Sequence, residues 1–214
     1  MKQDPCERLI EDTQMFLSKL AENNTREWFV AHKETYEDQL KSPAQVLLDQ
    51  VGAALHQQTG HVPTSKLFRP NRDVRFSKDK TPYHLHLHML WLTPPTGWFF
   101  GIGLQTVSIG AGIMGFDTDG VSRWRAAVAS AQGDAIASEV QSLLDLGARL
   151  QEPELKRVPA PFDKEHQHRD LLRRKSLCLW FDRQPESLAQ CPLTEEISAT
   201  FEKLAPLNHL LRGI

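Results

Sequence analysis

This chain has few cysteines, a small net charge and no long apolar run. Its cysteines, Cys6, Cys178 and Cys191, are odd in number and lack C-x-x-C spacing, which predicts reduced thiols rather than a disulfide framework or a zinc site. The formal net charge is only −2, so any nucleic-acid binding would have to come from a local patch. No apolar run approaches the roughly 20 residues that a bilayer-spanning helix needs, so we expect no membrane partner.

A secretory signal is also missing from the start of the chain. Met1–Pro5 carry an early charge and are followed by acidic residues instead of an apolar segment. The composition, 40% apolar and 24% charged, is that of an ordinary globular protein. We therefore expect a soluble cytoplasmic protein. Its 214 residues, without an internal repeat or a low-complexity linker, favour a single domain, 1–214.

The opening of the chain has the periodicity of helices. Apolar side chains recur at helical spacing in three segments, which are Glu7–Ala21, Thr25–Leu40 and Pro43–Gly60. Asn24 stands three residues before Glu27, which we interpret as a capping box that starts the second helix. Pro43 is typical of a helix start and Gly60 of a helix end. This region, 7–60, forms the predicted helical opening.

The period changes to that of strands after residue 66. The predicted strands are His84–Leu92, Trp98–Val107 and Ser108–Met114. Their connections are too short for parallel crossovers, so they form an antiparallel meander within a sheet core at 66–115. The remainder, 118–214, is helical and mixed; it includes a helical segment at Asp163–Lys175, a strand at Ser176–Phe181 and a last helix at Leu193–Leu204. The sequence thus predicts an α+β fold, a central antiparallel sheet flanked by N- and C-terminal helices.

The charge of the chain reverses locally in one segment, Lys66–His88, which we call the basic segment. It contains six cations and two carboxylates, namely Lys66, Arg69, Arg72, Arg75, Lys78 and Lys80 against Asp73 and Asp79. Three aromatic residues, Phe68, Phe76 and Tyr83, are interleaved with them. Such a cluster is costly to hold together unless an anion binds there or the aspartates bridge the cations.

We interpret the basic segment as the binding site of a small anionic ligand, phosphorylated or carboxylated, because arginine offers planar bidentate donors to those groups. The candidate ligand-binding residues are Arg69, Arg72, Asp73, Arg75, Lys78, Lys80, Tyr83, His84 and His86. Two alternatives stay open: a single-stranded nucleic-acid binding module, and a structural clasp in which ion pairs lock the fold. No nucleophile with an adjacent base is recognisable, so the catalytic residues, the cofactor and enzymatic activity itself remain unknown, as does the oligomeric state.

Two further patterns suggest a metal or a nucleotide. His84, His86 and His88 project from one face of a strand, but successive positions are roughly 7 Å apart, so we favour pocket lining over a shared metal ion. The string from Gly110 to Gly115 matches G-x-G-x-x-G. It lies in or at the end of the meander rather than at a helix start, which argues against a dinucleotide site.

The string R-D-x-R-F-S-x-D-K-x-P-Y, from Arg72 to Tyr83, resembles the bacterial "domain of unknown function 2461" family. Further matches extend the resemblance over nearly the whole chain, at Asn23–Phe29, Lys66–Arg69, Gly101–Gly115, Lys156–Pro159, Lys175–Leu177 and Phe201–Leu207. Where that family usually has a lysine after Pro-Tyr, this chain has His84, a cation that titrates near neutrality. The resemblance implies a single α+β domain with no established activity.

Overall fold

The computed structural model describes residues 6–188 and 192–214, which fall into two compact units. Unit 1 comprises the described residues of Met1–Trp91, Phe99–Ile109 and Asp182–Ala199. Unit 2 comprises Leu92–Trp98, Gly110–Phe181 and Thr200–Ile214. Met1–Pro5 and Cys191, on which two of the sequence predictions rest, lie outside the described residues. The single domain stays a prediction.

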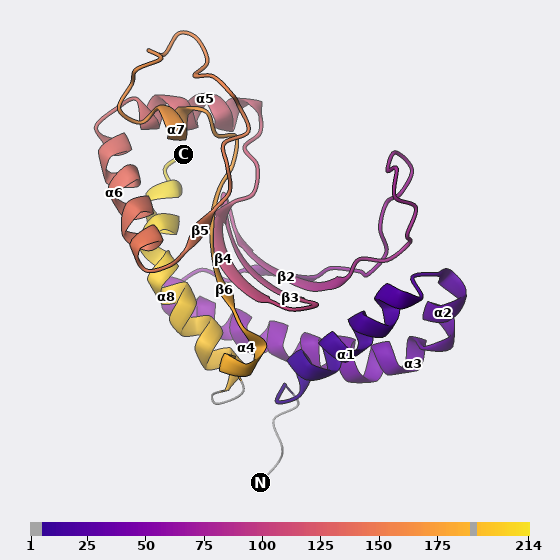
Figure 1. Cartoon of the computed structure of the whole chain (residues 1–214). Coiled ribbons are helices and arrows are strands. Elements are labelled where there is room, and N and C mark those ends of the chain that lie inside the picture. Colours follow the sequence, from indigo (N-terminus) through magenta and orange to yellow (C-terminus); the bar gives the residue numbers. More distant parts are fainter. Residues whose placement is uncertain (1–5, 189–191) are drawn as a thin grey trace. The chain divides into compact units, whose positions relative to one another are not determined.

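A six-stranded antiparallel sheet with helices at both ends of the chain confirms the α+β prediction (Figure 1). The strands are β1 (Thr64–Leu67), β2 (His86–Thr93), β3 (Thr96–Gly103), β4 (Val107–Ile113), β5 (Arg149–Leu150) and β6 (Leu177–Arg183). Their order is β1-β2-β3-β4-β6-β5, so β2, β3 and β4 form the predicted meander. At the last edge β5 is antiparallel to β6, with Arg149 opposite Trp180 and Leu150 opposite Leu179.

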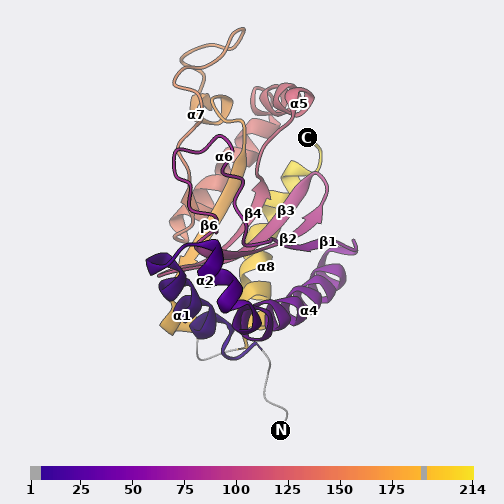
Figure 2. The ribbon, with the colours of Figure 1, turned by 90° about the vertical axis from the view of Figure 1, so that its right-hand side faces the viewer.

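Unit 1 begins with helices around an aromatic cluster. They are α1 (Leu9–Glu22), α2 (Arg26–Ala31), α3 (Lys33–Thr35), the π-helix η1 (Tyr36–Lys41) and α4 (Ser42–Thr59). The ring of Phe16 packs edge-on against Phe29 at a centroid distance of 6.0 Å and lies 5.8 Å from Tyr36. Tyr83 belongs to the same buried cluster, so packing fixes the end of the loop between β1 and β2 beside α2 (Figures 1 and 2).

The start of α2 differs from the prediction. Its N-cap is Thr25, whose Oγ1 accepts a hydrogen bond from the Trp28 N–H at 3.3 Å. Asn24 instead pairs with the backbone of Tyr83: its Nδ2 donates to the Tyr83 carbonyl at 3.0 Å and its Oδ1 accepts from the Tyr83 N–H at 3.1 Å. An asparagine amide offers a donor and an acceptor side by side, as a peptide group does. The predicted capping box of Asn24 and Glu27 is therefore wrong.

The predicted helix Thr25–Leu40 is also interrupted, at His32, where φ is −111° and ψ is 16°. The Nδ1 atom of His32 lies 2.8 Å from the Trp28 carbonyl oxygen, and its ring stacks on the Trp28 indole at 3.9 Å. The same carbonyl also accepts the His32 backbone N–H at 3.1 Å, so the side chain adds a second contact to the last backbone hydrogen bond of α2. The backbone is helical again from Lys33 and passes through η1 directly into α4.

The helices that follow the meander are α5 (Thr118–Val128), α6 (Gln132–Asp145), α7 (Arg169–Leu172) and α8 (Leu193–Leu211), with a 3-10 turn η2 (Pro185–Leu188) before α8. Helix α8 continues through Pro206 beyond the predicted end at Leu204, and its buried stripe goes on at Leu207 and Leu211. No helix in the described ranges is long and apolar enough to cross a membrane.

The predicted helix Asp163–Lys175 is reduced to the single turn α7. Asp163 Oδ1 accepts a hydrogen bond from the Glu165 N–H at 2.9 Å, and His166 Nδ1 accepts from the His168 N–H at 3.0 Å. Side-chain acceptors that take backbone donors compete with helical hydrogen bonds. The segment before α7 is therefore a chain of turns.

Two glycines of the G-x-G-x-x-G string lie in β4, where the meander was predicted. A Cβ on Gly112, whose φ is 137°, would lie 2.0 Å from the Leu177 carbonyl oxygen of β6. A Cβ on Gly110 would lie 2.5 Å from the Trp180 ring. The string therefore allows close approach between strands, a common role of glycine in sheets.

Candidate functional site

The basic segment forms a loop whose two arms pair near its base. Asn71 and Tyr83 form an isolated antiparallel bridge. Beside it the Arg72 N–H donates to the Pro82 carbonyl at 2.8 Å, and the His84 N–H donates to the Pro70 carbonyl at 2.8 Å. The loop projects from the sheet next to α2, as both views show (Figures 1 and 2). Residues 73–81 therefore form its tip.

The Arg72 side chain links the two arms of the loop. Its Nη1 donates to Asp79 Oδ2 at 2.5 Å and to the Thr81 carbonyl at 3.1 Å, and it also bonds the Thr81 hydroxyl. The Thr81 backbone N–H, the Arg72 guanidinium and the Thr81 hydroxyl together lower the pKa of Asp79 to about 2. The carboxylate is ionised at neutral pH, and the Arg72–Asp79 pair has the geometry of a clasp.

Arg75 and Asp73 form a second ion pair at the tip. Arg75 Nη2 lies 2.7 Å from Asp73 Oδ2 and its Nε lies 2.9 Å from Oδ1, a bidentate arrangement. These hydrogen bonds from Arg75 lower the pKa of Asp73. The two side chains are 77% and 53% exposed, and pairs so accessible to water contribute little to stability. The pair orients the Arg75 guanidinium but contributes little to the stability of the fold.

The other cations of the predicted site are more accessible. Lys80 Nζ donates to the Val74 carbonyl at 3.0 Å. Arg69 and Lys78 are exposed and make no hydrogen bond or ion pair with any residue that the structure describes. Phe76 is 96% exposed, with the Arg75 guanidinium 5.9 Å from its ring centroid. The structure thus separates Arg72, engaged with Asp79, from the more accessible cations of the basic segment.

Tyr83 and the histidines lie where the loop returns to the sheet. The Tyr83 ring is buried and stacks on Phe29 at 4.1 Å, which makes it a core residue. His84 precedes β2 instead of starting it, a correction to the predicted strand, because its N–H pairs with the loop. Its ring lies 4.7 Å from that of His86, which stacks on His88 at 3.9 Å. The three rings share one face, as their spacing predicts, and lie closer together than the backbone interval.

The histidine stack carries little positive charge at neutral pH. Burial lowers the pKa of His84, with the charge of Arg72 adding to the effect. Burial and the two neighbouring rings lower the pKa of His86 to about 4, and burial also lowers the pKa of His88. Within residues 6–188 and 192–214 no cluster of three or more His, Cys, Asp or Glu side chains is arranged to hold a metal ion.

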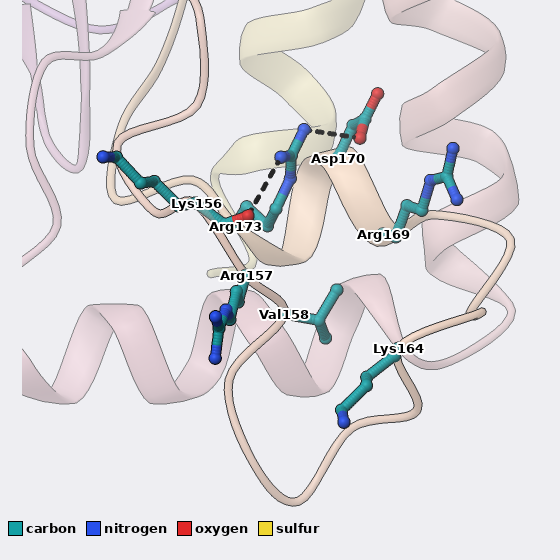
Figure 3. Close-up of a pocket in the computed structure, with 7 residues that line it drawn as sticks. All are labelled: Lys156, Arg157, Val158, Lys164, Arg169, Asp170 and Arg173. Atoms are coloured by element: carbon teal, nitrogen blue, oxygen red, sulfur yellow. Dashed lines mark hydrogen bonds and ion pairs between the residues drawn. The ribbon is translucent and has the colours of Figure 1, made fainter.

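Unit 2 contains a second cationic surface that the sequence analysis did not assign. It surrounds a hollow of about 590 Å³, which we call the cationic cleft (Figure 3). The lining residues are Lys156, Arg157, Val158, Lys164, Arg169, Asp170 and Arg173. The first four come from the turns between β5 and α7, and the last three come from α7 and the residue that caps it. Five of these lining residues are cations, and one, Asp170, is a carboxylate.

Arg173 connects the two walls of the cationic cleft. Its Nη2 donates to Asp170 Oδ1 at 2.8 Å, and its Nη1 donates to the Lys156 carbonyl at 3.5 Å, the two contacts drawn in Figure 3. Its own carbonyl accepts a hydrogen bond from the Leu155 N–H at 3.1 Å. The Nε of Arg173 is buried and has no acceptor among the described residues. Asp170 and the neighbouring backbone therefore orient the guanidinium of Arg173.

The remaining cations of the cationic cleft are less engaged. Arg169 lies 3.7 Å from Glu165 in an exposed pair. Lys156, Arg157 and Lys164 are exposed, and their side chains make no hydrogen bond or ion pair in the described part of the chain. The signals in the sequence were the Lys156–Pro159 match and the basic residues at the end of the segment that became α7. Only the folded turns bring them together.

The fold and these two surfaces define an α+β protein with an antiparallel meander, a clasped basic loop and a cationic cleft. The chain belongs to the family described as "Conserved hypothetical protein (DUF2461)", whose model matches residues 12–210. This match confirms the resemblance that began from the string at Arg72. A search of the curated proteins finds no match.

Proposed function

We propose that the protein binds a small phosphorylated or carboxylated ligand and that the anionic group of this ligand occupies the cationic cleft. The observation that carries the proposal is the imbalance of five cations against one carboxylate around a hollow of about 590 Å³. Sites for small molecules are concave and have volumes in this range. Like charges gathered in a hollow repel one another, and a bound anion would relieve that repulsion.

The donors in the cationic cleft suit the two ligand groups in different ways. Arginine binds phosphate or carboxylate through two parallel hydrogen bonds, so Arg157 and the oriented Arg173 are the proposed principal contacts. Lysine acts as a mobile point charge, a role that fits the exposed Lys156 and Lys164.

The basic segment is the alternative location for the same class of ligand. Arg69 and Lys78 are its accessible cations without partners among the described residues. Arg72, by contrast, already bonds Asp79 and Thr81, and this supports the structural clasp for that residue. An anion bound by the basic segment would therefore have to be held without Arg72.

A thermal-shift screen separates the two locations. The panel contains inorganic phosphate, sugar phosphates, nucleotides and organic acids, tested on the parent chain, Arg157→Ala and Arg69→Ala. A ligand at about 100 times its dissociation constant stabilises by about 2.7 kcal/mol, or roughly 5–10 °C for a chain of this length. The two arginines are matched controls, since both are exposed and unpaired among the described residues.

We expect the shift to disappear in Arg157→Ala and to persist in Arg69→Ala. The reverse result would move the ligand to the basic segment. A parent protein that responds to no member of the panel, at concentrations up to several millimolar, would refute anion binding.

A second candidate function is contact with single-stranded nucleic acid through the tip of the basic segment, and the almost complete exposure of Phe76 favours it. An exposed ring flanked by cations can stack a base while arginine and lysine neutralise phosphates. A tip of this size would neutralise two or three phosphates, giving a salt slope of about −1.5 to −2. Fluorescence anisotropy with oligo-dT tests it: no binding at low salt, or unchanged binding by Phe76→Ala, would exclude this role.

We also propose a cytoplasmic location, which the free and buried thiol of Cys178 supports. Reduced cysteines are typical of that compartment. Cell fractionation with reporters for each compartment would test this, and recovery in an extracytoplasmic fraction would contradict it.

A further inference from the structure

A second hollow, of about 440 Å³, lies against the same helix that borders the cationic cleft. We call it the adjoining hollow. It shares Arg169 and Asp170 with the cationic cleft, so the two are lined in part by the same residues of α7. Its other wall is of a different kind, because α6 contributes the apolar side chains of Ala137, Val140 and Leu144. One space is lined mainly by charged side chains, whereas its neighbour combines this apolar wall with polar side chains.

Arg174 is the buried polar group of the adjoining hollow. Only 7% of this residue is exposed, and its Nη1 donates to the Gln151 carbonyl at 2.6 Å. Its Nε is buried without an acceptor among the residues described. The nearby carboxylate of Glu154 is taken up by the Ser176 hydroxyl and the Lys175 N–H.

A guanidinium this buried is stabilised by the acceptors that reach it, and because Arg174 lines the adjoining hollow, a ligand oxygen there would be such an acceptor. The apolar side chains of α6 beside Arg174 suit the carbon skeleton of an organic ligand that carries this oxygen. A free inorganic anion would fill only the charged space.

We propose that the ligand has two parts: an anionic group held in the cationic cleft, and an organic body with a hydrogen-bond acceptor that lies in the adjoining hollow and reaches Arg174. This inference rests on the proposed function and adds the class of ligand, an organic phosphate or carboxylate larger than phosphate itself. Val140 and Leu144 would contact the carbon skeleton, and Gln141 would stand at its exposed edge.

The test compares two probes by isothermal titration calorimetry, inorganic phosphate and 4-carboxyphenyl phosphate, whose carboxylate supplies an acceptor. The informative variant is Ala137→Leu, which adds three carbons at a half-buried position that lines the adjoining hollow. Its matched control is Ala135→Leu, the same change at an exposed position of the same helix. Circular dichroism confirms that each variant is folded.

We expect the parent to bind the aryl phosphate about tenfold more tightly than inorganic phosphate, the effect of burying part of one ring. Ala137→Leu should reduce this preference to about twofold, and Ala135→Leu should leave it unchanged. The affinity for inorganic phosphate should be the same in all three proteins. If Ala137→Leu does not fold, Arg174→Lys replaces it, because lysine keeps the charge but lacks the planar guanidinium, and the same loss of preference is expected.

Two results would overturn the inference while leaving the proposed function intact. One is equal affinity for the two probes, and the other is a preference for the aryl phosphate that survives in Ala137→Leu. Failure of both probes to bind the parent would instead refute the proposed function, and the two-part ligand with it.

Discussion

The pairing of Asn24 with Tyr83 makes a strong prediction about stability. Asn24→Ala removes both hydrogen bonds that join the start of α2 to the end of the basic segment, at 3.0 Å and 3.1 Å. It also leaves the N–H and carbonyl of the mostly buried Tyr83 without these partners. The residues are 59 positions apart, so their contact closes a long loop.

The expected loss follows from the number and setting of these bonds. Each partly buried hydrogen bond contributes about 1 kcal/mol, and unsatisfied groups raise the cost of removing it. We expect Asn24→Ala to lower the free energy of unfolding by about 2 kcal/mol. For a chain of this length that corresponds to a fall in melting temperature of roughly 4–8 °C.

The neighbouring asparagine supplies the control. Asn23 Nδ2 donates only to the exposed Lys19 carbonyl, at 3.3 Å, so Asn23→Ala should cost less than about 0.5 kcal/mol. Urea denaturation gives both values, and hydrogen exchange should show faster exchange of the Tyr83 amide in Asn24→Ala alone. Equal stability of the two variants would refute the claim that this pairing anchors the basic segment.

Three further outcomes follow from burial and backbone geometry. Gly112→Ala should destabilise by at least about 3 kcal/mol, because its Cβ would meet the Leu177 carbonyl oxygen; a soluble variant with the parent's urea midpoint would contradict this. Folding lowers the pKa of His86 to about 4, so on acidification the unfolded chain takes up this proton before the folded protein does. The stabilisation from neutral His86 should therefore be complete above pH 6.5 and fall towards pH 4, by about 1 kcal/mol after allowance for partial exposure. His86→Gln should flatten that decline in urea titrations. Burial raises the pKa of Cys178 to about 12, so peptide-resolved mass spectrometry should find it unalkylated by iodoacetamide at pH 8 in the native protein and modified in urea.

The fold class could be predicted from the sequence because the periodicity of apolar residues depends only on residues close together in the chain. The apolar stripe of α4, its end at Gly60 and the meander around β3 all follow from spacing and turn residues. The errors arose at local contacts between a side chain and the backbone. His32 contacts the Trp28 carbonyl where α2 ends, Asp163 accepts the Glu165 N–H in the turns before α7, and neither contact alters the apolar pattern.

The same distinction applies to the candidate sites. The charge reversal of the basic segment was visible because its cations lie close together in the sequence. Its internal partners were only partly predictable: an arginine–aspartate clasp was foreseen as an alternative, but the choice of Asp79 for Arg72 depends on the bend of the loop. The cationic cleft was not foreseen, because Arg157 and Arg173 come to line one hollow only through turns that lack any periodicity.

Two glycines in neighbouring strands suggest how sequences in this family can vary. Gly101 leaves room for the His88 ring, which lies 2.6 Å from where a Cβ would be, and Gly110 does the same for Trp180. In each case the glycine on one strand makes room for the large ring on the neighbouring strand, so the two positions are sterically coupled. We expect such positions to change together in evolution: an alanine at 101 should be accompanied by a smaller residue at 88. Covariation between these pairs would then record strand register directly, even between homologues too divergent to align by their helices.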